Sequence, residues 1–169
     1  MVNQEKLLAA LTALNTPPVP FTLENVVLSP PTSFPGPNPW NTRVTISAVP
    51  AKGYSSGLDF YYHRIDLAEL GDLAVVSAVP VTVAGILLVL NNANAALDQD
   101  RAELDVSDLE EITLPRMYEH GDAAFINLTA RANSYGWCGE NNLLVAYNLP
   151  DVSELETFLY QTAPGYFPG

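Results

Sequence analysis

Apolar and polar residues alternate along two pairs of segments, which predict a β-hairpin in each half of the chain. Residues 43–48 and 58–63 follow this pattern, and residues 50–57, which contain two glycines, separate them. The same pattern returns at residues 125–130 and 143–147. Because successive side chains of a strand point to opposite faces, a period of two predicts half-buried strands joined by turns.

Two other segments have features of helices. Four leucines recur at helical spacing within residues 7–14 and predict one apolar stripe on a short helix. Residues 73–90 are apolar over about the minimum length of a membrane span, but Pro80 interrupts them. We therefore expect a buried strand, a break at the proline, and a helix over residues 83–97 that Thr82 caps. This helix is apolar nearly all round, which predicts that it is buried.

Five short segments occur in the same order in both halves of the chain. They lie at 7–15, 22–26, 43–48, 53–54 and 66–70, and again at 86–94, 105–109, 125–130, 136–137 and 151–155. Their spacing drifts in one direction, from 79 to 85 residues, as short loop insertions would produce. The sequence therefore predicts an α+β, β-rich fold of two tandem diverged modules. Each module is a short helix packed on a small antiparallel sheet with a β-hairpin. We place module one at residues 1–72, module two at 73–155 and a C-terminal tail at 156–169.

Composition narrows the class of partner. The chain has 7 Lys and Arg residues against 19 Asp and Glu, a net charge of -12. Because nucleic-acid binding depends on basic side chains that neutralise phosphates, we expect neither nucleic acid nor a membrane as a partner.

One cysteine, Cys138, excludes an internal disulfide. Residues 1–6 lack the basic-then-apolar layout of a signal peptide. Five prolines between residues 30 and 40 predict an extended, irregular loop.

The residues with chemical potential do not combine into a recognisable reactive site. His63 lies on an alternating strand and is expected at the surface, and His120 lies in a short polar loop. Cys138 has acidic neighbours, which oppose the lowered pKa that a nucleophile needs. Residues 98–105 resemble part of a calcium loop but lack its central glycine, so we expect a solvated helix end. We therefore expect no catalytic residue, metal, cofactor or small-molecule substrate.

Aromatic side chains in loops are the candidates for an interface. Such groups are typical of protein–protein contacts, and they equally suit residues that cap the small core of their own module. The tail at residues 163–169 either frays or docks on another chain, and its three large apolar groups favour docking. The interface candidates are Phe34, Trp40, Tyr54, Trp137, Tyr166 and Phe167.

Three motifs in the first half occur together in one protein family. They are a Leu-rich "LLxxLN"-type helix at residues 7–15, a "T-x-x-D-V"-like segment at 22–26, and a hairpin at 41–67. The hairpin has the form "N-T-x-V … G-Y-x-G … Y-Y-x-R-I/L-D-L". In these motifs the chain resembles a module of virion structural proteins of large tailed bacteriophages, of the myophage or jumbo-phage type. The second half departs from the pattern, because it has Gly-Trp-Cys-Gly at 136–139 and Tyr-Asn-Leu at 147–149.

The resemblance implies a non-enzymatic building block of a phage particle, with no catalytic residues to transfer. The expected partners are copies of this chain and other virion structural proteins, and the expected location is the virion, after synthesis in the host cytoplasm. Small acidic duplicated modules suit attachment to a lattice, so we prefer head decoration to a neck or tail accessory. Two alternatives stay open. Exposed aromatics on β-loops would suit a glycan- or receptor-binding module, and paired carboxylates would suit a small hydrolase.

Overall fold

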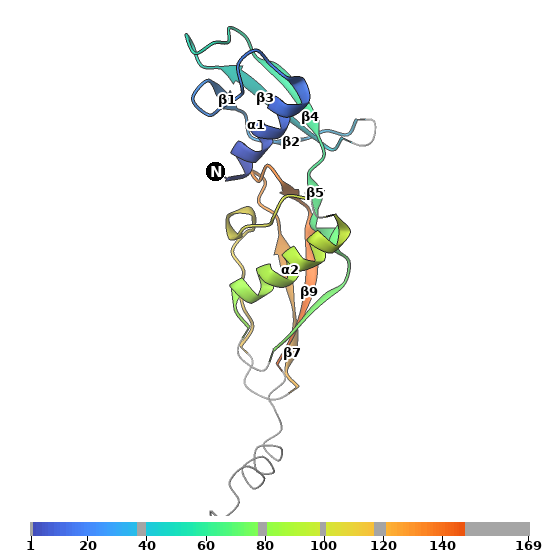
Figure 1. Ribbon diagram of the computed structural model, residues 1–169. Coiled ribbons are helices and arrows are strands. Elements are labelled where there is room, and N and C mark those ends of the chain that lie inside the picture. Colours follow the sequence, from blue (N-terminus) through green and yellow to red (C-terminus); the bar gives the residue numbers. More distant parts are fainter. Residues whose placement is uncertain (1, 37–39, 78–80, 99–100, 117–120, 148–169) are drawn as a thin grey trace, which may run out of the picture.

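The computed structural model describes residues 2–36, 40–77, 81–98, 101–116 and 121–147, which form two halves stacked along one axis (Figure 1). The elements of the first half are α1 (Val2–Asn15), β1 (Val26–Leu28), β2 (Thr32–Ser33), β3 (Thr42–Ala48) and β4 (Leu58–Tyr62). Next come β5 (Ile65–Asp66), the 3-10 helix η1 (Leu67–Leu70) and β6 (Leu73–Ser77). The second half continues with α2 (Val83–Leu97), η2 (Val106–Asp108), β7 (Ala123–Thr129), β8 (Trp137–Cys138) and β9 (Glu140–Tyr147). The fold is α+β and β-rich, as predicted.

The first sheet has β3 at its centre and α1 on one face (Figure 1). β4 pairs antiparallel with one edge of β3, with Val44 opposite Phe60, while β1 and β2 pair with the other edge. Thr42, Val44 and Ile46 are buried on the inner face, which confirms the predicted alternation. Leu14, the last leucine of the predicted helix stripe, is exposed. The first core consists of Leu8, Leu11, Val26, Leu28, Val44 and Ile46.

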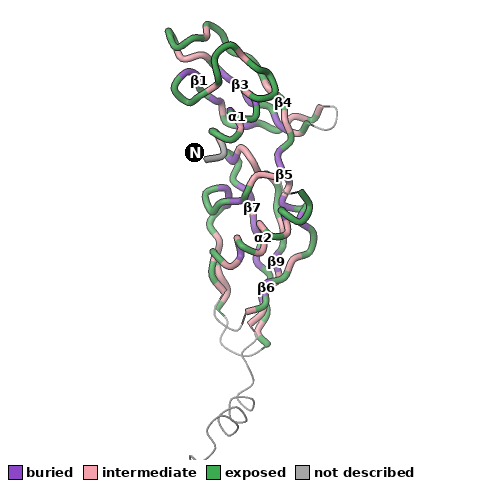
Figure 2. Tube along the Cα trace, in the orientation of Figure 1, coloured by how far each residue is buried: buried purple, intermediate pink, exposed green. Residues whose placement is uncertain are grey.

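The second sheet has β9 at its centre, between β6 and β7, and α2 on one face. β6 runs parallel and β7 antiparallel to β9, so Leu143 lies opposite both Leu73 and Ile126. Thr82 caps α2 as predicted, because its hydroxyl accepts a hydrogen bond from the Gly85 amide at 3.1 Å. Buried positions follow the inside of both halves (Figure 2). The second core contains Ile65, Leu67, Leu70, Val75, Ile86, Leu90, Leu104, Leu109, Ile126, Leu128, Ala130, Trp137, Leu143 and Val145.

The prediction that α2 is buried all round is wrong. One stripe of the helix, at Ile86, Leu90 and Asn94, is buried against the second sheet. Leu88, on another side of the helix, is exposed. A helix that packs on a single sheet buries only the residues that face the sheet, whatever the composition of its other sides.

Residues 65–77 leave the first half and become part of the second. β5 pairs parallel with β8, so that Ile65 lies opposite Trp137, and β6 forms an edge strand of the second sheet. Gly139 follows β8 with a φ of +75°, and a Cβ at this position would overlap the Asp66 carboxylate. The close passage of this crossing segment therefore requires glycine.

The short helix η1 anchors the crossing segment in the second core. Its N-terminus carries a capping box, in which Asp66 accepts from backbone amides and the Glu69 carboxylate accepts from the Asp66 amide at 3.1 Å. Leu67 and Leu70 are buried among residues of the second core. These residues precede the boundary predicted at residue 72, so the core of the second half extends back to β5.

One turn in each half makes the same side-chain hydrogen bond. In the first half, the Thr22 amide donates to Oδ1 of Asn25 at 2.9 Å. In the second half, the Asp105 amide donates to Oδ2 of Asp108 at 3.1 Å. Asn25 and Asp108 are both buried, where a polar group is costly unless it is hydrogen-bonded. These turns belong to one of the repeated segments predicted from the sequence.

A second matched contact ties the helix of each half to the chain that follows it. The Phe21 amide donates to Oγ1 of Thr12 at 2.9 Å, and the Leu104 amide donates to Oδ1 of Asn91 at 2.8 Å. The antiparallel pairs beyond these turns also match, at Val26–Ala48 and Leu109–Ala130. These shared contacts support the interpretation of two diverged copies.

Candidate functional site

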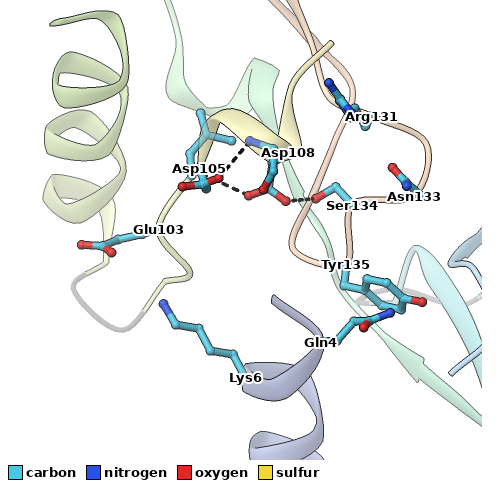
Figure 3. A pocket seen from close by; sticks show the side chains of 11 residues that line it. Gln4, Lys6, Glu103, Asp105, Asp108, Arg131, Asn133, Ser134 and Tyr135 are labelled. Carbon is cyan, nitrogen blue, oxygen red and sulfur yellow. Dashed lines mark hydrogen bonds between the residues drawn. The ribbon is translucent and has the colours of Figure 1, made fainter. Parts of the chain in front are cut away.

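A cleft of about 490 Å³ opens between the two halves (Figure 3). Gln4 and Lys6 of α1 line one side, and residues 103–108 and 131–135 of the second half line the other. Lys6 extends from α1 into this space (Figure 3). The cleft thus brings one cation of the first half near an acidic loop of the second.

Two aspartates on the cleft wall, Asp105 and Asp108, are engaged in local hydrogen bonds. Asp105 accepts from the Ser107 amide at 2.9 Å, and its hydrogen bonds with Ser107 hold the pKa of Asp105 below its ordinary value. Asp108 accepts from the Ser134 hydroxyl at 2.7 Å as well as from the Asp105 amide. A carboxyl that acts as general acid in a hydrolase needs a raised pKa instead. The pair therefore stabilises the turn, and the hydrolase alternative gains no support from this cleft.

Arg64 joins the two halves. Its Nε donates to Oγ1 of Thr42 at 3.0 Å, and its Nη1 donates to the carbonyls of Ser134 at 3.1 Å and Trp137 at 3.4 Å. Asn41 accepts from the Arg64 amide at 2.8 Å and donates to the Arg64 carbonyl at 2.9 Å. These motif residues thus build a buried joint. The sequence interpretation did not assign Arg64 this role, although its place in the motif was a signal.

Trp137 and Tyr54 occupy corresponding positions in the two halves. Trp137 is 0% exposed, and its indole N–H donates to the Glu103 carbonyl at 3.4 Å. It therefore fills the second core instead of anchoring a partner, because β5 runs directly beside it. Tyr54 is half-buried, packs on Phe21 with ring centroids 5.3 Å apart, and donates to the Val19 carbonyl.

Phe34 and Trp40 are accessible on the first half. Phe34 packs against Tyr61 of β4 with ring centroids 4.5 Å apart, and Trp40 is 48% exposed. The structure thus leaves aromatic surface available at this edge of the first sheet. The other two interface candidates, Tyr166 and Phe167, lie outside the described residues.

Cys138 is half-buried in the joint between the halves. Its Sγ lies 3.9 Å from the Arg64 carbonyl oxygen. Burial raises the pKa of the thiol, the Arg64 guanidinium opposes this rise, and the carboxylates of Asp66 and Glu69 add to it. A thiol in this setting is a poor nucleophile, in agreement with the sequence interpretation.

His63 lies at the surface, as predicted, with Nε2 3.2 Å from Oε1 of Glu69. Arg101 binds the same carboxylate. Burial raises the pKa of Glu69, but hydrogen bonds from the Asp66 backbone, Arg101 and His63 outweigh burial and hold it below its ordinary value. His120 lies outside the described residues. Within the described part of the chain, no three metal-ligating side chains come together.

The face of the second sheet opposite α2, here called the outer face, is uncovered by any described element, and its part beside the end of β9 is apolar. Phe125 is 73% exposed and Val76 is 62% exposed. Its apolar rows are Phe125–Leu144–Ala74 and Ala123–Ala146–Val76, and its other two rows, Asn127–Asn142 and Thr129–Glu140, are polar. Contiguous apolar surface is typical of interaction sites. The sequence interpretation considered loops and missed this face, whose signal was that successive residues are apolar at 73–76 of β6 and 143–147 of β9.

The corresponding face of the first sheet is more polar, although Val27 and Tyr61 are exposed on it. Arg43, Thr45 and Asp59 lie there on β3 and β4, and the Thr45 hydroxyl donates to Asp59 at 2.6 Å. The contrast lies beside the end of β9, where the second sheet exposes two rows of apolar side chains without a polar one. No helix among the described residues is long and apolar enough to cross a membrane.

The fold and these surfaces define an α+β protein with two joined cores, a partly apolar outer sheet face and a polar cleft between the halves. The chain belongs to DUF7941, a family of unknown function, whose model matches residues 2–159. No curated protein and no solved structure matches this chain.

Proposed function

We propose that this chain is a non-enzymatic structural protein of a tailed-phage particle, which assembles with copies of itself and with other virion proteins. The observation that carries the proposal is the apolar outer face of the second sheet. Fully burying a side chain such as Phe125 or Val76 contributes about 1.5–3 kcal/mol. A neighbour that covered the apolar rows of this face would therefore gain several kcal/mol.

The use of the motif residues supports the same proposal. Asn41 and Thr42 bond to Arg64, and Arg64 donates to backbone carbonyls of the second half. Motif residues that serve packing, and not chemistry, suit a building block. The phage assignment comes from the sequence resemblance, and the preference for head decoration over neck or tail rests on the small size and acidity of the chain.

Particle composition tests the proposal. Mass spectrometry of purified particles of the phage that encodes this chain should detect it at a fixed ratio to the major head or tail protein. A density map of the same particles would assign its position. Absence of the wild-type chain from purified particles would overturn the proposal.

A matched pair of variants tests the outer face. Val76 and Val27 are similarly exposed valines on the outer faces of the second and first sheets. Val76→Ser, alone or with Phe125→Ser, should lower incorporation into particles, whereas Val27→Ser should not. Equal incorporation of all these variants would show that the outer face is not the contact.

Glycan or receptor binding is the second candidate, and the accessible aromatics on the first half favour it. Trp40 is half exposed, and the Phe34–Tyr61 pair lies on the same half. Specific binding on a glycan array that Trp40→Ala abolishes would support this function. Binding that survives Trp40→Ala, or no binding at all, would count against it.

A further inference from the structure

The second half depends on a segment that the first half supplies. Residues 66–70 form the capped helix η1, whose Leu67 and Leu70 fill part of the second core. Residues 73–77 then pair in parallel with β9. Asn141 of β9 fixes the segment, because its side chain donates to the Leu67 carbonyl at 2.8 Å and to the Gly71 carbonyl at 3.1 Å. Without this segment, the second half would have an apolar recess and an unpaired strand edge. The crossing segment fills both.

The first half has the same recess, and it is open. A cavity of about 180 Å³ lies beside β4 and is lined mainly by apolar side chains. By the matched contacts and strand registers, Phe21, Val26, Ile46, Tyr54 and Phe60 correspond to Leu104, Leu109, Leu128, Trp137 and Leu143. All five counterparts are buried in the second half. In the first half, three of the five are only half-buried.

Leu58 gives the sharpest contrast between the halves. Strand register places it where the second half has Asn141, the residue that holds the crossing segment. Leu58 lines the cavity and is 63% exposed. Among the described strands, β4 pairs with β3 alone, so its second edge is open where β9 binds β6.

The sequence contains a second segment of the crossing type, at residues 151–162. It lies outside the described residues, and its likeness to residues 66–77 is one of sequence. Asp151 and Glu154 repeat the capping-box pair, and Val152 and Leu155 repeat the two buried leucines. Phe-Leu-Tyr-Gln-Thr at 158–162 then stands where β6 has Leu-Ala-Val-Val-Ser, and aromatic and β-branched residues favour strands.

We propose that residues 151–162 of one copy dock on the first half of a second copy, in the way that residues 66–77 serve the second half. Val152 and Leu155 enter the cavity beside β4, and residues 158–162 add a strand parallel to β4. Main-chain hydrogen bonds along the strand edge supply affinity, and the apolar recess supplies specificity.

The position of the chain's end favours a second copy over docking on the same molecule. β9 ends at the pole of the described structure opposite the first half (Figure 1). Asp151 follows the last residue of β9, Tyr147, by only four residues. Four residues span at most about 14 Å, so Asp151 stays nearer to that pole than to the cavity of its own first half. The resulting contact is head-to-tail, so repetition gives a ring or an open filament.

This inference deepens the proposed function and rests on it for the role of the assembly. The donor variant is the full chain with Val152→Ser and Leu155→Ser, and the acceptor variant is the full chain with Leu58→Asp. Leu14→Asp is the matched control, because Leu14 is an exposed leucine of the first half that does not line the cavity. Circular dichroism and thermal melting establish that each variant folds.

Size-exclusion chromatography with light scattering reads out the assembly. Wild type and Leu14→Asp should form species that grow with concentration in multiples of 18.3 kDa. Each blocked variant alone should remain at 18.3 kDa. Mixed in equal amounts, the two blocked variants should form a 1:1 complex of twice that mass, because each keeps the part that the other lacks.

Several outcomes would overturn the inference. Wild type that stays monomeric would show that the segment docks on its own molecule or not at all. Assembly that survives Leu58→Asp would place the contact elsewhere, and blocked variants that do not complement each other would exclude a head-to-tail contact. These results are independent of particle composition: a monomeric chain found in virions would refute the inference alone, and a head-to-tail assembly absent from virions would refute the proposed function alone.

Discussion

Replacing the buried Arg64 by methionine should uncouple the two halves and destabilise the protein. Methionine fills much of the space of the arginine stem but donates no hydrogen bond. The change leaves Oγ1 of Thr42 and the carbonyls of Ser134 and Trp137 without the donors that now lie 3.0, 3.1 and 3.4 Å away. Since these acceptors lie in the joint, the loss affects the contact between the halves more than either core.

The magnitude follows from the two shorter hydrogen bonds. A hydrogen bond to a charged group contributes about 1.5–3 kcal/mol, so two of them contribute about 3–6 kcal/mol. Removing a buried guanidinium also removes its desolvation cost, which offsets part of this loss. We expect Arg64→Met to lower the free energy of unfolding by about 3 kcal/mol, a large fraction of the 5–15 kcal/mol typical of a folded domain.

Urea unfolding followed by tryptophan fluorescence and circular dichroism measures this change. With a slope of about 2 kcal/mol per molar urea, the midpoint should fall by about 1.5 M. Arg43→Met is the matched control, because Arg43 is half exposed and lies 4.0 Å from Asp59. Such a surface pair contributes at most about 1 kcal/mol. An Arg64→Met midpoint no lower than that of Arg43→Met would refute the role of Arg64 as the joint.

Three further predictions concern the residues around this joint. Trp137→Ala should destabilise the chain by about 3–5 kcal/mol, because it opens a cavity in the second core. Trp40→Ala should cost less than about 1 kcal/mol in the same urea titration. Similar losses of stability in the two variants would contradict the different burial of the two tryptophans. Cys138 should react slowly with iodoacetamide at neutral pH and faster in urea, since burial raises its pKa, and equal rates followed by mass spectrometry would exclude this protection. The folded-state pKa of Glu69 is lowered, so the stability that Glu69 contributes is present above about pH 4.3 and is lost as pH falls through the folded pKa. Glu69→Gln should therefore reduce the free energy of unfolding at pH 7 more than at pH 3. A constant difference between wild type and Glu69→Gln across this range would contradict the prediction.

Local pattern predicted the elements better than it predicted their burial. Alternation identified β3 because Val44 and Ile46 face a helix of the same half, which is a short-range arrangement. The same reasoning failed for Leu58 and Leu88, whose apolar side chains are exposed because no described element covers them. Apolar character shows that a side chain gains from being covered, but only the tertiary structure determines whether something covers it.

The site residues that the sequence interpretation missed depend on contacts between distant parts of the chain. Trp137 and Tyr54 look alike as loop aromatics after glycine, and the parallel pairing of β5 with β8 decides that Trp137 alone becomes core. The motif pointed to Arg64, but the local sequence could not show which groups it binds. A buried arginine is rare, and its acceptors at Ser134 and Trp137 lie about 70 residues further along the chain.

The matched contacts and the open recess together suggest why the two halves differ. Matched hydrogen bonds keep the same turn and the same helix attachment in both halves, so the difference between them is not one of basic fold. The halves differ in whether the recess is filled: residues 66–77 fill the recess beside β9, and the recess beside β4 is open. On the proposal above, a chain with one filled recess, one open recess and a second segment of the filling type is completed by another copy. Under this interpretation the outer face of the second sheet serves a different, lateral neighbour, so Phe125→Ser should leave the head-to-tail contact intact while it lowers incorporation into particles.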